Sequence, residues 1–278
     1  MPRRNNFKIL IVLSEYGYWG EELVGPLAAF DARGYETVFA TATGKQPRAL
    51  PPSMDPEYID PPLGRSVTTE EVARLTRELD ESDRLSSPLS LAGWVPERPY
   101  TSDRDYLRRL EAYHRAVAVV ADELEDYDAL LIVGGSGPLV DMANNERLHE
   151  VILAFVRADK PVAAECYGVA ALAFARDWTD RRSILWGKRV TGHCKEYDYK
   201  DGTGFLNTDF VIGPPPYPLE YVLRDATGPE GAFVGNFGRE LSVIVDHPFI
   251  TGRSTPDSYL TGEKVVDALE HGLRRYGW

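Results

Sequence analysis

The chain has 278 residues, of which 43% are hydrophobic and 27% are charged, a composition typical of a globular protein with a sizeable core. Its formal net charge of -12 at pH 7 opposes binding to a phosphate backbone or an anionic membrane surface. Two cysteines are too few for a disulfide framework or a four-thiolate zinc site, and no stretch reaches the roughly 20 apolar residues of a membrane helix. We therefore expect a cytoplasmic protein that acts on a small molecule and binds neither nucleic acid nor a membrane.

The first 46 residues predict a strand, a helix and a second strand. Residues 7–13 form a nearly continuous apolar run, as in a strand buried on both faces. Leu23, Leu27 and Phe30 follow at helical spacing, and residues 35–42 alternate like a strand. This order is typical of a parallel βαβ unit.

Regular alternation stops between residues 47 and 127. Six prolines between residues 47 and 62 argue against a sheet interior. Thr68 and Glu71 predict a capping box before one helix, and a stripe from Leu107 to Leu124 predicts another. We interpret residues 47–127 as an insertion folded over the core of a single domain that spans residues 1–278. A lid over an active site is the functional interpretation, and a structural flap is the alternative.

The second half returns to α/β alternation and places a glycine-rich loop and a cysteine at strand ends. The strand at residues 129–133 runs into Gly134-Gly135-Ser136-Gly137, and the strand at residues 161–165 meets Cys166. Such alternation predicts an α/β fold with a parallel sheet. Further helices are predicted at residues 148–155, 168–176 and from 255 onward, and further strands at 188–192, 232–235 and 241–245.

Cys166 is the first candidate for a reactive residue. A turn between a buried strand and a helix exposes a side chain and directs helix N-terminal amides at it. Those amides stabilise a thiolate, so we expect a lowered thiol pKa and a good nucleophile. The alternative is a buried structural cysteine.

Two other elements are expected at the same edge of the sheet. The amides of Gly135 and Ser136 can face an oxyanion, because glycines permit close approach. Glu22, in the first predicted helix, can reach Cys166 as an acid or base, although a glutamate there also compensates the helix dipole. The loop lacks the spacing of a phosphate-binding or dinucleotide motif.

Five ordered blocks resemble the ThiJ/PfpI superfamily, which has a class I glutamine amidotransferase-like fold. They are SEYGYWGEELVGPLAAFDARGYETVFATATG, YDALLIVGGSGPLVDM, VAAECYGVAAL, LWGKRVTGH and FITGRSTPDS, and they are most similar to the branch of heat-shock chaperones and glyoxalase III enzymes. The resemblance implies a flavodoxin-like three-layer sandwich with a mostly parallel central sheet, a helical insertion after the second strand, and a homodimer.

The resemblance also implies roles for particular residues. Cys166 is the implied nucleophile, and the family's glutamate, four residues before a proline, falls at Glu22 because of Pro26. Glyoxalase III members convert methylglyoxal to lactate through a cysteine hemithioacetal, so no cofactor and no metal are expected. Other members are deglycases, peptidases, isonitrile hydratases or holding chaperones.

The sequence departs from this family pattern at two positions. Tyr167 stands where the glyoxalase III branch has a histidine directly after the cysteine, and Ser136 replaces the histidine of the usual GGHG loop. Glyoxalase activity is therefore expected to be poor. His193 is a candidate replacement base, with Glu196 or Asp198 orienting it.

Cys194 is an alternative as a resolving thiol, but neighbouring residues on a strand point to opposite faces. We therefore expect only one of His193 and Cys194 to face Cys166.

These residues lead to three functional hypotheses. The first is a cofactor-independent hydrolase or lyase with Cys166 as nucleophile, Glu22 as acid/base, and Gly135, Ser136 and the amide of Tyr167 as oxyanion donors. In this hypothesis the Tyr167 hydroxyl contributes or its ring walls the pocket, and Asp198 belongs to the substrate site. The second is a non-catalytic holding chaperone or cysteine oxidation sensor in a stress response, and the third is a specialised biosynthetic enzyme.

Overall fold

The computed structural model describes residues 6–61, 63–100, 102, 104–198 and 218–278. An eight-stranded sheet with the order β12-β10-β11-β7-β6-β1-β2-β5 forms its centre. Strands β1, β2, β5, β6, β7 and β11 pair in parallel, and β10 pairs antiparallel with β11 and β12. The mostly parallel sheet predicted from the sequence is confirmed. Its strands are β1 (Lys8–Val12), β2 (Glu36–Thr41), β5 (Leu89–Ser90), β6 (Ala129–Ile132), β7 (Val162–Glu165), β10 (Val243–Asp246), β11 (Phe249–Gly252) and β12 (Arg275–Tyr276).

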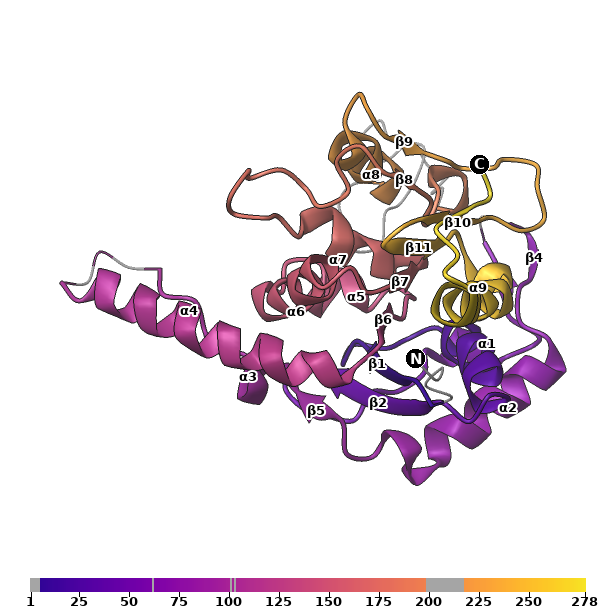
Figure 1. Cartoon of the computed structure of the whole chain (residues 1–278). Helices are drawn as coiled ribbons and strands as arrows, with labels where there is room; N and C mark the ends of the chain where they lie inside the picture. The colour runs from indigo at the N-terminus through magenta and orange to yellow at the C-terminus, as the bar shows by residue number, and fades with distance from the viewer. Residues whose placement is uncertain (1–5, 62, 101, 103, 199–217) are drawn as a thin grey trace.

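Helices cover both faces of this sheet and give it three layers (Figure 1). On one face α1 packs against α9, and α2 packs on the outer side of α1. On the other face lie α6 and α7, with α5 and α8 beside α7 (Figure 1). The longer helices are α1 (Gly20–Asp31), α2 (Glu70–Glu81), α4 (Tyr106–Glu123), α6 (Glu146–Arg157), α8 (Leu219–Thr227) and α9 (Ser258–His271), and the short ones are α3 (Leu91–Trp94), α5 (Pro138–Asp141) and α7 (Val169–Phe174).

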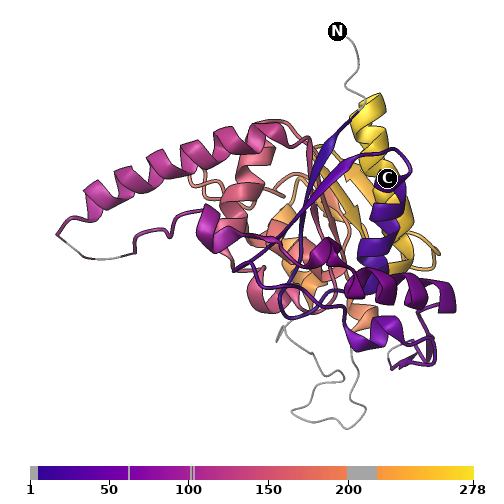
Figure 2. The same ribbon diagram turned by 90° about the horizontal axis from the view of Figure 1, so that it is seen from below.

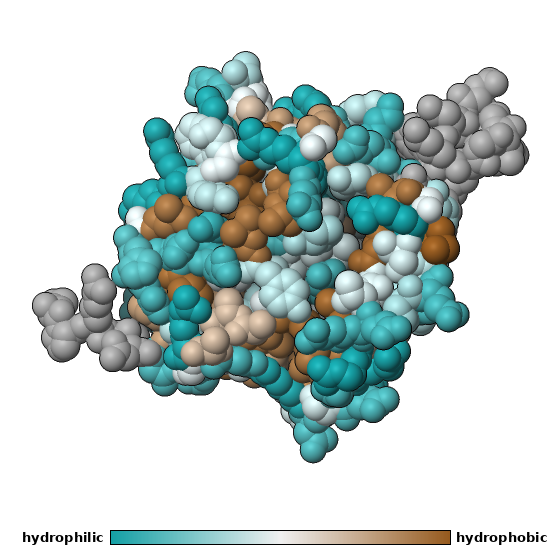
Figure 3. Space-filling view, turned by 90° about the vertical axis from the view of Figure 1, so that its right-hand side faces the viewer, coloured by the Kyte–Doolittle hydropathy of each residue, from teal (hydrophilic) through white to brown (hydrophobic). Residues whose placement is uncertain are grey.

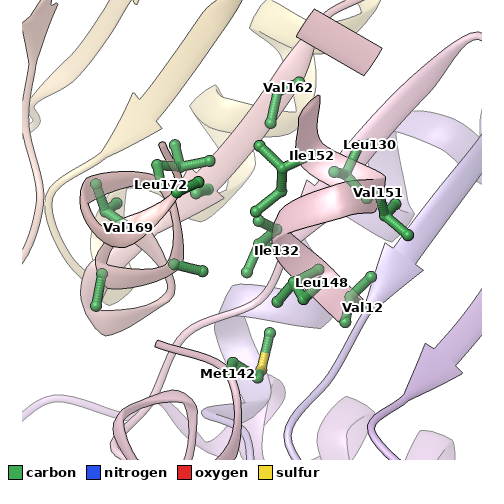
Figure 4. Close-up of a cluster of buried hydrophobic side chains, with 14 of the residues drawn as sticks. Val12, Leu130, Ile132, Met142, Leu148, Val151, Ile152, Val162, Val169 and Leu172 are labelled. Atoms are coloured by element: carbon green, nitrogen blue, oxygen red, sulfur yellow. The ribbon is translucent and has the colours of Figure 1, made fainter. Parts of the chain in front are cut away.

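Two hydrophobic cores result from the alternation of side chains along the strands. Ile9 and Ile11 of β1 belong to the core under α1 and α9, whereas Leu10 and Val12 belong to the core under α6 and α7. Figure 4 shows part of this second core, in which Val12, Leu130, Ile132 and Val162 from the strands face Leu148, Val151, Ile152, Val169 and Leu172 from the helices. Burial on both faces explains why the strands read as continuous apolar runs.

Residues 47–127 are attached to the main body at both faces. Within this segment, α2 packs against α1, and β5 extends the sheet beyond β2. The short strands β3 (Ile59–Asp60) and β4 (Arg65–Ser66) form a separate hairpin. Whether the segment works as a lid stays a prediction.

The helix α4 extends away from the sheet (Figures 1 and 2). The predicted stripe is buried only toward its C-terminal end, at Tyr113, Val120 and Leu124, whereas Leu107 is 72% exposed. The face that carries α9 mixes small apolar patches with hydrophilic side chains (Figure 3). Among the described helices, none is long and apolar enough to cross a bilayer.

Several predicted boundaries differ from the structure. The side chain that caps α2 is that of Thr69, which accepts a hydrogen bond from Val72 N at 3.2 Å, and not that of Thr68. The predicted strands at residues 188–192 and 232–235 shorten to β8 (Arg189–Val190) and β9 (Ala232–Phe233), which pair with each other outside the main sheet. Strand β11, in the centre of the sheet, was not predicted. The strands β3, β4, β5 and β12 were not predicted either, because they have only two residues each and carry no periodic pattern of their own.

Candidate active site

The site lies where the sheet order reverses, at the carboxyl ends of β1, β6 and β7. The chain leaves β1 for β2 on one side and later returns to β6 on the other side of β1. Ligand sites of open α/β sheets form at such a switch point. Here α1 follows β1, the loop from Gly134 follows β6, and Cys166 follows β7.

Cys166 stands on a sharp turn directly after β7. Its φ is 50°, in the left-handed region, and its residue exposure is only 7%. Gly134 lies against it, since a Cβ added there would lie 2.8 Å from Cys166 Cβ and would overlap Glu22 Oε2. The turn is therefore fixed by close packing of the three strand ends, and such strain at a non-glycine residue is typical of functional positions.

Glu22 approaches Cys166 from the first turn of α1. It is 1% exposed, and its carboxyl contacts both the thiol of Cys166 and the backbone N–H of Gly135. Burial is the main cause that raises its pKa to about 8. Glu21 faces another direction, where its Oε2 accepts a hydrogen bond from Thr255 Oγ1 at 2.8 Å.

The thiol of Cys166 is not the low-pKa thiolate that its position after the strand suggests. Burial first, and then the charge of Glu22, raise its pKa well above the ordinary value. The backbone N–H groups of Gly135 and Tyr167 donate to the sulfur and act in the opposite direction, but more weakly. The expectation of a lowered pKa is wrong because desolvation of the charged form outweighs two amides. Ser136 lies one position beyond Gly135, and its carbonyl accepts from Leu139 N at 3.2 Å.

His193 lies beside the sulfur, three residues after β8. Its Nδ1 is 3.5 Å from Cys166 Sγ, and its backbone N–H donates to the Cys166 carbonyl at 3.4 Å. Its Nε2 is 3.2 Å from Oδ1 of Asp198, which is 3% exposed. Of the two orienting candidates, Asp198 rather than Glu196 lies beside the imidazole, at ion-pair distance but without a hydrogen bond to Nε2. The imidazole thus lies between Cys166 and Asp198.

Tyr167 packs against the face of the His193 imidazole. Its ring stacks on the His193 ring with centroids 4.0 Å apart and planes inclined by 23°. Its hydroxyl donates to Asp198 Oδ1 at 2.7 Å, so the hydroxyl is already engaged and is not directed at an oxyanion near the sulfur. Of the polar groups of Tyr167, only the backbone amide is placed to donate to an oxyanion near the sulfur.

Cys194 points away from Cys166, because the adjacent residues His193 and Cys194 direct their side chains to opposite sides. It is fully buried in the core under α6 and α7, and burial raises its pKa to about 12. Within the described residues, no group of three or more His, Cys, Asp or Glu side chains is arranged to hold a metal ion.

Sequence reasoning missed Glu165, the last residue of β7. It is fully buried, and burial together with the charge of Glu22 raises its pKa well above the ordinary value. A glutamate inside the otherwise apolar strand VAAE was the available signal. It places a second carboxyl behind the site on the α1 and α9 side, near Thr261.

Cys166 should react faster than Cys194 with iodoacetamide in the folded protein. Although both thiol pKa values are raised, Cys166 has some exposure, an adjacent imidazole and two amide donors, whereas Cys194 is 0% exposed. Alkylation across pH, followed by mass spectrometry of the two peptides, measures this order. Denatured protein, in which both thiols label equally, is the control, and faster labelling of Cys194 in the folded state would refute the assignment.

The fold places the chain in the class of flavodoxin-like α/β proteins, here with a cysteine on the sharp turn after a central strand. A profile of the family described as ThiJ/PfpI family-like matches residues 13–201. The chain belongs to this family.

Among curated proteins, the bovine glutamine amidotransferase-like class 1 domain-containing protein 1 is 29% identical over 146 residues. The match covers 52% of this chain and 61% of the bovine protein, so the chain matches less than two thirds of that relative's length. The human protein of the same name is 28% identical over 147 residues, with the same coverage.

Solved structures of low sequence identity share the fold. Glyoxalase III from Candida albicans superposes with a TM-score of 0.60 at 18% identity, covering 95% of this chain and 98% of that one. DJ-1beta of Drosophila melanogaster superposes with a TM-score of 0.53 at 13% identity, covering 95% and 90%. The predicted fold class and family resemblance are confirmed.

Proposed function

We propose that this protein is a cofactor-independent enzyme in which Cys166 attacks a small electrophilic carbon, leading to hydration, hydrolysis or lyase chemistry. The observation that carries the proposal is the 3.5 Å contact between Cys166 Sγ and His193 Nδ1, with Asp198 at the far side of the imidazole. A thiol whose pKa is raised needs a base at the moment of attack, and this geometry supplies one.

The first step follows from the positions of these groups. Asp198 favours the tautomer with the proton on Nε2, which leaves the Nδ1 lone pair facing the thiol. As the sulfur bonds to the electrophilic carbon, its proton passes to Nδ1, and the electron pair of the carbonyl or nitrile moves onto the heteroatom. The amides of Gly135 and Tyr167 stabilise that charge, and a protonated Glu22 returns a proton to it.

The small exposure of Cys166 sets a size limit on the substrate. Only 7% of the residue is exposed, and the Leu50 side chain lies close to Gly135 at the same edge. A compact molecule fits such a site better than a folded protein or a long peptide does.

A panel of small aldehydes, ketones, nitriles and amides tests the proposal, with Cys166→Ala as the reference. Methylglyoxal should modify Cys166 faster than the protein converts it to lactate, because the histidine that usually follows the cysteine is Tyr167. Lost acid/base help is typically worth 10²- to 10⁴-fold in rate. Turnover should disappear in Cys166→Ala. A methylglyoxal rate matching that of glyoxalase III enzymes would contradict the expectation for that substrate. Equal turnover by the unchanged protein and by Cys166→Ala would contradict the proposal that Cys166 is the nucleophile of an enzyme.

A holding chaperone is the second candidate, favoured by the exposed apolar side chains of α4. Leu107 is 72% and Val119 is 57% exposed on this extended helix. A chaperone of this kind suppresses aggregation of a heated client protein equally well with and without Cys166. Loss of suppression in Leu107→Glu but not in Cys166→Ala would support this second candidate.

A further inference from the structure

We propose that Tyr167 is a positioning residue, which holds Asp198 and thereby sets the proton affinity of His193. The proposal rests on the proposed function, because it concerns the base that serves Cys166. It assigns the side chain of Tyr167 a role that neither oxyanion binding nor substrate contact describes.

The first support is that the Tyr167 hydroxyl and the imidazole of His193 meet at one carboxylate oxygen, which accepts a hydrogen bond from the tyrosine only. Asp198 Oδ1 accepts the Tyr167 hydroxyl at 2.7 Å and lies 3.2 Å from His193 Nε2. The shorter contact belongs to the tyrosine. An oxygen that already accepts a short hydrogen bond attracts a second proton less strongly, so the tyrosine weakens the pull of Asp198 on the imidazole.

The second support is the stacked arrangement of the two rings. With centroids 4.0 Å apart and planes inclined by 23°, the Tyr167 ring restricts tilting of the imidazole away from Cys166. Tyr197 contacts the same imidazole edge-on at 6.0 Å, so it touches His193 without sharing its plane. The pair therefore offers a close and a distant tyrosine for comparison.

The third support is that the Tyr167 hydroxyl remains a donor at all relevant pH values. Burial, followed by the charge of Asp198, raises its pKa far above the ordinary value. The other titratable groups near this assembly are Cys166 and, more distantly, Asp60 of β3, both of which act in the same direction on the tyrosine. Glu22 acts on the cysteine from α1 and completes the charged surroundings.

A consequence for pH dependence follows from this arrangement. In Tyr167→Phe the stack remains, but Asp198 is released to interact with His193 alone. The negative charge of Asp198 then acts on the imidazole of His193 without competition from the tyrosine hydroxyl. The acidic limb of the reaction profile of Cys166, where the imidazole must be unprotonated, should move to higher pH.

The experiment compares Tyr167→Phe, Tyr197→Phe and Asp198→Asn in the full chain. The probe is chloroacetamide, and the rate of Cys166 modification is followed by mass spectrometry from pH 5 to pH 9. We expect the acidic limb to move up by about half to one pH unit in Tyr167→Phe, which corresponds to a three- to tenfold lower rate at pH 6. It should move down in Asp198→Asn and stay in place in Tyr197→Phe.

An unchanged profile in Tyr167→Phe would overturn the proposal, as would an equal shift in Tyr197→Phe. A parallel measurement on His193→Ala separates this failure from failure of the proposed function. If His193→Ala slows modification while Tyr167→Phe leaves the profile unchanged, only the positioning role is wrong. If His193→Ala also has no effect, His193 is not the base that serves Cys166, and the proposed function fails. An unfolding curve of each variant verifies that its rate was measured on folded protein.

Discussion

Replacing His193 with alanine is expected to lower the rate at which Cys166 reacts with a small carbonyl compound at pH 7 by about 10²- to 10⁴-fold, the usual value of general base help. The effect should be large because the pKa of the thiol is raised by burial and by Glu22, so little thiolate exists without a base. Stopped-flow or quenched mass spectrometry of the adduct measures the rate. At higher pH the variant should recover part of the loss, since hydroxide then supplies the thiolate.

The matched control for this variant is His271→Ala. His271 ends α9, and its side chain is 61% exposed, so the same substitution is made at a histidine that is exposed at a helix end and is not part of the site. It should behave like the unchanged protein. Equal rates for His193→Ala and the unchanged protein would mean that the 3.5 Å contact has no part in the reaction.

Glu22→Gln is expected to stabilise the folded protein at pH 7 while impairing its chemistry. The folded-state pKa of Glu22 is raised to about 8 from the ordinary value of 4.5. Between these two values the folded chain binds a proton that the unfolded chain releases, so stability is full below pH 4.5 and falls as pH rises. At pH 7 a large part of this stability is lost, because pH 7 lies closer to 8 than to 4.5.

Glutamine has nearly the same shape and no such loss. The variant should therefore be more stable than the unchanged protein at pH 7, and its Tm should be higher by several degrees. This gain in stability should vanish near pH 4.5. Thermal unfolding at pH 4.5 and pH 7 measures the difference, and Glu21→Gln serves as the control because its side chain is bonded to Thr255 and is less buried. If the Glu22→Gln protein is equally stable or less stable than the unchanged protein at pH 7, the raised pKa of the buried Glu22 carboxyl is wrong.

The same substitution should change the thiol in a defined direction. The charge of Glu22 is one of the two main causes that raise the pKa of Cys166. Above about pH 8, where Glu22 ionises, Glu22→Gln should therefore alkylate faster at Cys166 than the unchanged protein does. In the proposed function, Glu22 lowers stability and thiol reactivity but holds a proton that it can donate to the substrate, a form of the stability–activity trade-off of active sites.

The sequence by itself determined most of the central elements and the place of the cysteine, but it did not show β11, which lies between β10 and β7. Apolar runs such as residues 7–13 and 129–133 indicate strands that are largely buried on both faces. The strand-to-helix turn at Cys166 can be recognised from the adjacent residues alone. The two-residue strands β3, β4, β5 and β12 could not be predicted, because strands this short exist only through the partner that pairs with them. The sequence indicated β8 and β9, but not that they pair with each other outside the main sheet.

Only the tertiary structure decided the electrostatics of the site. The raised pKa of Cys166 and the engagement of the Tyr167 hydroxyl by Asp198 both depend on residues distant in sequence being packed together. The choice of Asp198 over Glu196 depends on the local backbone path after His193, which the sequence pattern does not show. Glu165 became part of the site for the same reason, since a carboxyl in a strand is unremarkable until no water reaches it. Patterning along the chain records which side chains leave water, but the free energy of a buried charge depends on what surrounds it in three dimensions.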